Sequence, residues 1–119
     1  MAKAKNNPIA PVEFELTNGE VVELVITWGL LIQLRSKSKH DYQRYSKLVS
    51  GGVSDDIIGM VTIVYAGYLC GLINKQGDTK GCMTEEEFLE LVPNDYSAVT
   101  IAVNGMLSPK SQRASENPS

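Results

Sequence analysis

The sequence predicts a mostly helical α+β fold, in which an N-terminal β-hairpin packs on a bundle of about five helices around a central apolar helix. Residues 12–26 alternate apolar and polar side chains around a Thr-Asn-Gly turn, which is typical of a hairpin. Residues 57–74 are eighteen residues without a charge, and such a helix needs burial on all sides. The 119 residues suit one domain, expected over 12–109 between a flexible lead (1–11) and a disordered tail (110–119).

The register of the hairpin follows from the turn. A two-residue Asn-Gly loop would set Phe14 opposite Glu23, whereas a three-residue loop with Gly19 in the left-handed conformation sets Phe14 opposite Val22. We predict the three-residue loop, because it puts apolar side chains on one face and leaves an acidic outer face of Glu13, Glu15 and Glu23. Two strands alone are marginally stable, so the apolar face must lie on helices.

Two amphipathic helices are expected next. Thr27 is a suitable N-cap for a helix over about 28–37, in which Trp28, Leu31, Ile32 and Arg35 follow helical spacing and Leu30 and Leu34 widen the apolar face. A second helix over about 39–49 would place on one side Tyr42, Tyr45, Leu48 and Val49. Gly51-Gly52 is expected to end it.

The apolar helix is expected over about 55–73. Ser54 is the predicted cap, with Asp55 and Asp56 in the first turn, where the helix dipole favours negative charge. Gly67 and Gly71 are four residues apart and share a face, which would let another helix or the hairpin approach closely. A membrane span is the alternative reading, but interior glycines dilute the segment and no Lys or Arg cluster flanks it, so we predict no membrane association.

Two shorter helices complete the predicted domain. Thr84 and Glu87 form a capping box for a helix over about 85–92 that ends at Pro93 and turns inward Phe88, Leu91 and Val92. Asn94 or Asp95 would cap the last helix, over about 95–107, whose buried stripe would be Val99, Ala102, Val103 and Met106. Ser108-Pro109 is expected to close it.

Composition and residue chemistry argue against several functions. A net charge of -3 gives no basic footprint for nucleic acid. Cys70, Cys82 and His40 are too few and too scattered for a disulfide framework or a zinc site, and Cys70 is expected to be a small core residue. His40 has no activating neighbour, and no glycine-rich phosphate loop is present, so no catalytic residue or cofactor is assigned and the chain is predicted not to be an enzyme.

One segment imitates a calcium loop. Between residues 76 and 88 the glycine, the apolar residue, the final glutamate and the following aromatic residue stand at calcium-loop spacing. The first, third and fifth positions would be Gln76, Asp78 and Lys80, however, and a lysine ammonium repels the ion. We therefore assign no metal site.

Trp28, Tyr42 and Tyr45 are the candidate partner-binding residues. Amphipathic aromatic side chains are enriched at the centres of protein interfaces. Packing in the core of this domain is the alternative role for each of them, and it is the favoured one.

The order of parts resembles the tail assembly chaperones of long-tailed phages that infect Gram-positive bacteria. The resemblance covers about residues 12–110 and rests on Phe-Glu-Leu-Thr-Asn-Gly (14–19), Leu-Leu-Ile-Gln-Leu-Arg (30–35), a tyrosine-containing basic helix, Tyr-Ala-Gly-Tyr-Leu-Cys (65–70) and Met-Thr-Glu-Glu-Glu-Phe-Leu-Glu-Leu-Val-Pro-Asn-Asp (83–95). These motifs are structural and not catalytic.

The resemblance implies a non-enzymatic helper that coats the helical tape measure protein, helps recruit tail tube subunits, acts as a homo-oligomer in the host cytoplasm and is absent from the mature virion. Many such proteins also have a longer, frameshifted form. It transfers no individual binding residue. The alternative is a structural tail or head-tail connector subunit that stays in the virion. The mechanism inferred for the chaperone is reversible burial, in which apolar patches of this domain cover exposed apolar helices of the client until the tube replaces it.

Overall fold

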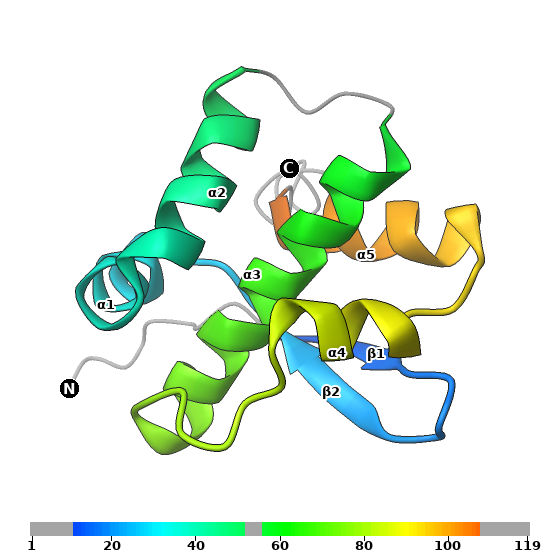
Figure 1. The fold of residues 1–119 in the computed structure, drawn as a ribbon, viewed down its shortest axis with the longest axis horizontal. Helices are drawn as coiled ribbons and strands as arrows, with labels where there is room; N and C mark the ends of the chain where they lie inside the picture. The colour runs from blue at the N-terminus through cyan, green and yellow to red at the C-terminus, as the bar shows by residue number, and fades with distance from the viewer. Residues whose placement is uncertain (1–10, 52–55, 108–119) are drawn as a thin grey trace, which may run out of the picture.

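A computed structural model describes residues 11–51 and 56–107 and has the predicted fold class. A hairpin of β1 (Val12–Glu15) and β2 (Val21–Leu24) is followed by five helices (Figure 1): α1 (Trp28–Lys37), α2 (Lys39–Ser50), α3 (Ile57–Gln76), α4 (Glu85–Leu91) and α5 (Tyr96–Leu107). The predictions for residues 1–10, for the cap at Ser54 and Asp55, and for the end of the chain from Ser108 lie outside the described residues.

The hairpin has the predicted register. Phe14 pairs with Val22 and Val12 with Leu24, and Gly19 takes a φ of 88° in the turn. The Asn18 side chain accepts a hydrogen bond from the Glu20 backbone N–H at 3.0 Å, which stabilises the tight loop. The alternating burial of the strands puts Phe14, Val22 and Leu24 in the core and the glutamates outside, as expected.

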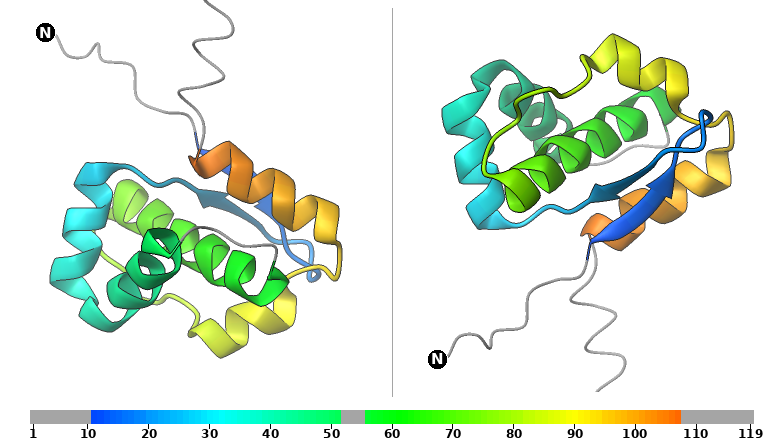
Figure 2. Two further views of the ribbon diagram at one scale, coloured as in Figure 1. Left: turned by 90° about the horizontal axis from the view of Figure 1, so that it is seen from above. Right: turned by 90° about the horizontal axis from the view of Figure 1, so that it is seen from below.

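Helix α3 is the centre of the molecule. It packs against β2 and the four other helices, and Figure 2 shows these elements arranged around it. It is the one described helix long and apolar enough to cross a membrane, yet 78% of an 18-residue stretch of it is buried inside the fold. Protein side chains here supply the surroundings that lipid would supply in a span.

The predicted bounds of α3 were wrong at both ends. The helix begins at Ile57, because the side chain of Asp56 accepts a hydrogen bond from the Ile58 N–H and so acts as the N-cap itself. It continues to Gln76, three residues past the predicted end, because the left-handed Gly77 (φ 89°) provides the C-cap. The polar residues 74–76 form an exposed last turn and not the start of a loop.

The two glycines of α3 make the predicted close approach. Gly67 lies between Leu24 and Met106, and its carbonyl oxygen accepts a hydrogen bond from the Val25 N–H at 3.2 Å. Gly71 lies directly against the backbone carbonyl of Glu23. Side chains at these two positions would hold the hairpin away from α3.

Aromatic stacking and hydrogen bonds hold α4 and the loop before it on α3. Phe88 is fully buried, with its ring centroid 4.8 Å from that of Tyr68 and 5.5 Å from that of Tyr65. The Tyr65 hydroxyl donates to the Met83 carbonyl oxygen at 2.8 Å, and the Met83 N–H donates to the Tyr68 hydroxyl at 3.0 Å. The predicted capping box of α4 and the predicted buried stripe of α5 are both present, with Asp95 as the cap of α5.

Candidate functional site

The three candidate partner-binding aromatics do not share one environment. Trp28 is 85% exposed at the start of α1. Tyr42 is half-buried, and the Arg35 guanidinium lies 5.8 Å from its ring centroid. Tyr45 is 7% exposed, and burial raises the pKa of its hydroxyl. Tyr45 therefore has the core role, while Trp28 has the exposure that a partner contact needs.

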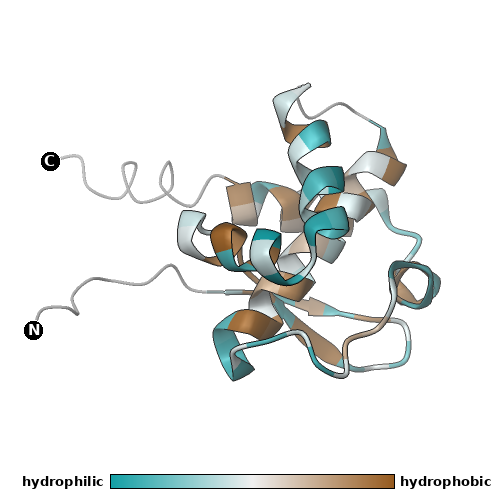
Figure 3. Ribbon diagram, turned by 60° about the vertical axis from the view of Figure 1, so that its left-hand side comes forward, coloured by the Kyte–Doolittle hydropathy of each residue, from teal (hydrophilic) through white to brown (hydrophobic). Residues whose placement is uncertain are grey.

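The exposure of Trp28 follows from the orientation of α1. The helix buries Leu30, Leu31 and Leu34, so the apolar face predicted through Trp28 and Ile32 was wrong. Both of those side chains point outward, because the leucines define a face about a third of a turn away and pack against α2 and α3. Val49 of α2, also predicted to be inward, is exposed at its edge. Figure 3 shows that the outer helices carry both apolar and polar positions.

A groove between α2 and α3 exposes further apolar surface. We call it the α2–α3 groove, and it is lined by apolar and polar residues: Leu48, Ile58, Gly59, Arg44, Lys47, Asp56 and Thr62. Ile58 is 63% exposed there although it belongs to the apolar helix. The lining combines apolar residues with two cations and the Asp56 carboxylate, which suits an amphipathic helix with polar residues along its edges.

A polar contact fixes one side of this groove. Arg44 of α2 donates from Nη2 to Glu85 of α4 at 2.8 Å, and the Thr62 hydroxyl of α3 lies 3.3 Å from the same carboxylate oxygen. The pair is partly exposed, so its contribution to stability is on the order of 1 kcal/mol or less. Its structural effect is to join three helices at the groove.

A second groove lies between β1 and α5. Its apolar lining includes Val12, Phe14, Ala98, Ile101 and Ala102, and its acidic residues are Glu13, Glu15 and Asp95; we call it the β1–α5 groove. Ile101 is 68% exposed. Because α5 buries its face through Val99, Ala102, Val103 and Met106, Ile101 points the other way.

The thiols and the histidine are not arranged for catalysis. Burial raises the pKa of the Cys70 thiol to about 12, and burial also raises the pKa of Cys82. His40 has a side chain that is 81% exposed, with Nδ1 3.8 Å from Asp41, whose carboxylate instead accepts a hydrogen bond from the Ser38 hydroxyl at 2.5 Å. Neither thiol is an activated nucleophile. His40 lines an open hollow on α2 with Tyr42, Arg44 and Lys47, and among the described residues no thiol or carboxylate lines it.

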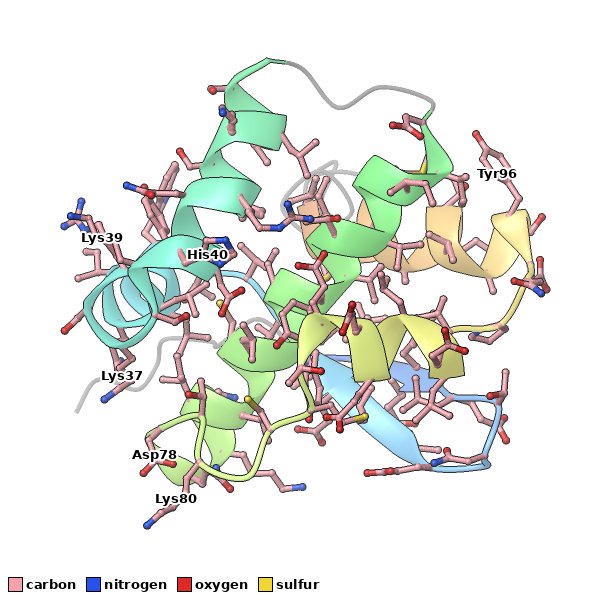
Figure 4. All side chains as sticks on the ribbon, viewed as in Figure 1. Lys37, Lys39, His40, Asp78, Lys80 and Tyr96 are labelled. Atoms are coloured by element: carbon pink, nitrogen blue, oxygen red, sulfur yellow. The ribbon has the colours of Figure 1, made fainter. Side chains whose placement is uncertain are left out.

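In the calcium-like segment, the side chains of Gln76 and Asp78 form hydrogen bonds within the segment itself. The Gln76 side-chain amide donates to the backbone oxygens of Asp78 and Lys80, at 3.1 and 2.9 Å, and the Asp78 carboxylate accepts from the Lys80 N–H at 3.0 Å. Lys80 is exposed, and its side chain points away from the fold (Figure 4). Within residues 11–51 and 56–107, no group of three His, Cys, Asp or Glu side chains is placed to hold a metal ion.

Sequence reasoning missed Ile58 and Ile101 as candidate contact residues. For Ile101 a signal existed, since this large apolar residue lies off the stripe predicted for its helix. For Ile58 no such signal existed, because every neighbour in an all-apolar segment looks alike.

Comparisons with models of protein families, with curated proteins and with solved structures find no match to this chain.

Proposed function

We propose that this chain is a non-enzymatic tail assembly chaperone of a long-tailed phage, which binds the tape measure protein and helps recruit tail tube subunits. The observation that carries the proposal is the α2–α3 groove, where Ile58 is 63% exposed beside the half-buried Leu48. An open groove with an exposed isoleucine beside a half-buried leucine offers apolar side chains to a helix, which suits a protein that covers apolar surface on a client. The sequence resemblance supplies the identity of that client.

The proposed contact is a client helix laid in the α2–α3 groove. Apolar client side chains at helical spacing would cover Leu48 and Ile58, while Arg44 and Lys47 would meet acidic or polar groups at the rim. Several copies bound along one long client would together cover it stably, although each single contact is weak. Replacement by tube subunits then requires only that each single contact stay weak.

Capture of the tape measure protein of the same phage by purified, tagged chain tests the proposal. An Ile58→Asp variant should lose at least tenfold in capture, because a carboxylate would have to be desolvated against an apolar helix. Aspartate in the first turn of α3 suits the helix dipole, so the variant should keep its fold. Asn104→Asp, an exposed position on α5, is the matched control and should capture like the wild type.

Equal capture by all three proteins would contradict the assignment of the groove, and no capture by the wild type would contradict the function. Mass spectrometry of purified virions distinguishes the chaperone from the alternative, a structural tail or head-tail connector subunit. Only a retained structural subunit would be found in the particle. We expect the chain to be missing from it.

A further inference from the structure

Charge is divided unevenly between two regions of the molecule. Residues 28–51, which form α1 and α2, carry five lysines and arginines against one acid, Asp41. The remaining described residues carry eleven acids against two lysines. Figure 4 shows Lys37 and Lys39 at the α1–α2 end of the longest axis and Tyr96, at the start of α5, toward the other end. A second copy can therefore bring unlike charges together only by presenting the opposite region.

Each region also carries an exposed apolar feature, which is a side chain in the basic region and a groove in the acidic region. The basic region presents Trp28, 85% exposed, with Ile32 one turn further along the same side of α1. The acidic region presents the β1–α5 groove, an open space of about 370 Å³ with Ile101 exposed in its lining. An aromatic side chain entering an apolar pocket, with charges at the rim, is the usual arrangement of an energetic centre in an interface.

We propose that Trp28 of one copy of this chain docks in the β1–α5 groove of a second copy. The indole ring covers Ile101 and Ala98, and the cations of α1 and the start of α2, Arg35, Lys37 and Lys39, face Glu13, Glu15 and Asp95 at the rim. No third molecule is required, because both halves of the contact are surfaces of this one sequence.

The contact joins unlike surfaces and is therefore head-to-tail. Pairing two α1–α2 regions would oppose basic side chains, and pairing two β1–α5 grooves would oppose acidic ones. A head-to-tail contact leaves one free Trp28 and one free groove at the ends of every dimer, so further copies add until the assembly closes into a ring or continues as a filament. This inference does not depend on the proposed function, since it involves the chain alone and a groove other than the α2–α3 groove.

The single tryptophan makes the contact directly measurable. Trp28 is the only tryptophan among the 119 residues, so its fluorescence reports this one position. With increasing protein concentration, we expect the emission maximum to move to shorter wavelength as the indole leaves water, with a parallel rise in the sedimentation coefficient. High salt should weaken both changes, because the rim contacts are charged.

Two variants break opposite halves of the contact. Trp28→Ala keeps the groove and Ile101→Asp keeps the tryptophan; each alone should weaken association at least tenfold. Mixed together, they should form a 1:1 dimer that grows no further, with a blue-shifted Trp28 signal. Ser36→Ala, an exposed position on α1, should associate like the wild type, and Glu13→Lys provides a second, independent change in the groove.

Fluorescence and sedimentation of the wild type and the variants give results that either support or overturn the contact. Blue-shifted emission together with rescue in the mixture supports the contact. A wild type that stays monomeric with concentration-independent emission overturns it, and so does association of Trp28→Ala equal to that of the wild type. Either of these negative results leaves client capture through the α2–α3 groove unaffected, so the two proposals fail separately.

Discussion

The α-carbon of Gly71 faces the backbone carbonyl oxygen of Glu23, so closely that a side-chain carbon at position 71 would overlap that oxygen. The contact joins the central helix to β2, and its rigid partner is backbone and not a side chain that could turn away. The docking of the hairpin on α3 therefore requires glycine, which has no side chain, at position 71.

Gly71→Ala is expected to destabilise the fold by about 3 kcal/mol, because relief of the overlap requires β2 to move away from α3. Gly29→Ala is the control, since a methyl group there meets nothing within 4 Å and alanine favours a helix by up to about 1 kcal/mol. Urea unfolding followed by circular dichroism measures both. A Gly71→Ala variant as stable as the wild type would show that the hairpin is not packed as described.

This contact also shows what sequence could predict. The spacing of Gly67 and Gly71 was enough to expect a close approach, and the turn at Gly19 was enough to set the strand register, because both are local rules of backbone geometry. Which element would approach the glycines was left open between a helix and the hairpin. Both do, since Met106 and Leu24 meet Gly67 and the Glu23 backbone meets Gly71.

The orientation of α1 could not be predicted in the same way. Its apolar residues surround much of the helix, so two faces satisfy helical spacing, and only packing against α2 and α3 selects the one through Leu30, Leu31 and Leu34. The proposed contact through Trp28 depends on that choice, because it leaves Trp28 exposed. The Arg44–Glu85 contact joins residues 41 positions apart and likewise follows from tertiary packing alone.

Arg44 and Glu85 are expected to show a small favourable coupling. A double-mutant cycle with Arg44→Ala and Glu85→Ala should give about 0.2–1 kcal/mol, because the pair is partly exposed and water competes for both charges. The coupling should fall as salt is raised. Strictly additive losses of stability would mean that the two side chains do not meet in solution.

Stability is expected to fall in alkaline solution. The Cys70 thiol has its pKa raised by burial from 9.0 to about 12, so above about pH 9 the unfolded chain releases a proton that the folded chain retains. The full contribution is present below pH 9 and is lost as pH rises toward the folded pKa, by at most about 1.4 kcal/mol per pH unit for one group. The buried tyrosines, whose pKa values are also raised by burial, add to the loss above their ordinary value of 10.0.

Urea unfolding at a series of pH values checks this dependence. Cys70→Ala should start from lower stability but lose less of it between about pH 9 and pH 10, where the thiol titrates ahead of the tyrosines. The native Cys70 thiol should also resist alkylation until the protein unfolds, because it is fully buried. Rapid labelling of Cys70 in the native state would contradict its placement in the core.

Co-expression tests the central claim most directly: that this domain keeps an apolar helical client in solution through its open surfaces. The proposed client, the tape measure protein of the phage to which we propose the chain belongs, would be produced with the wild-type chain, with Ile58→Asp, and without either. Its soluble and pelleted fractions would then be compared. We predict that the wild type moves most of the tape measure protein into the soluble fraction and that Ile58→Asp does so far less. A pelleted fraction that is the same in all three cases would contradict the account.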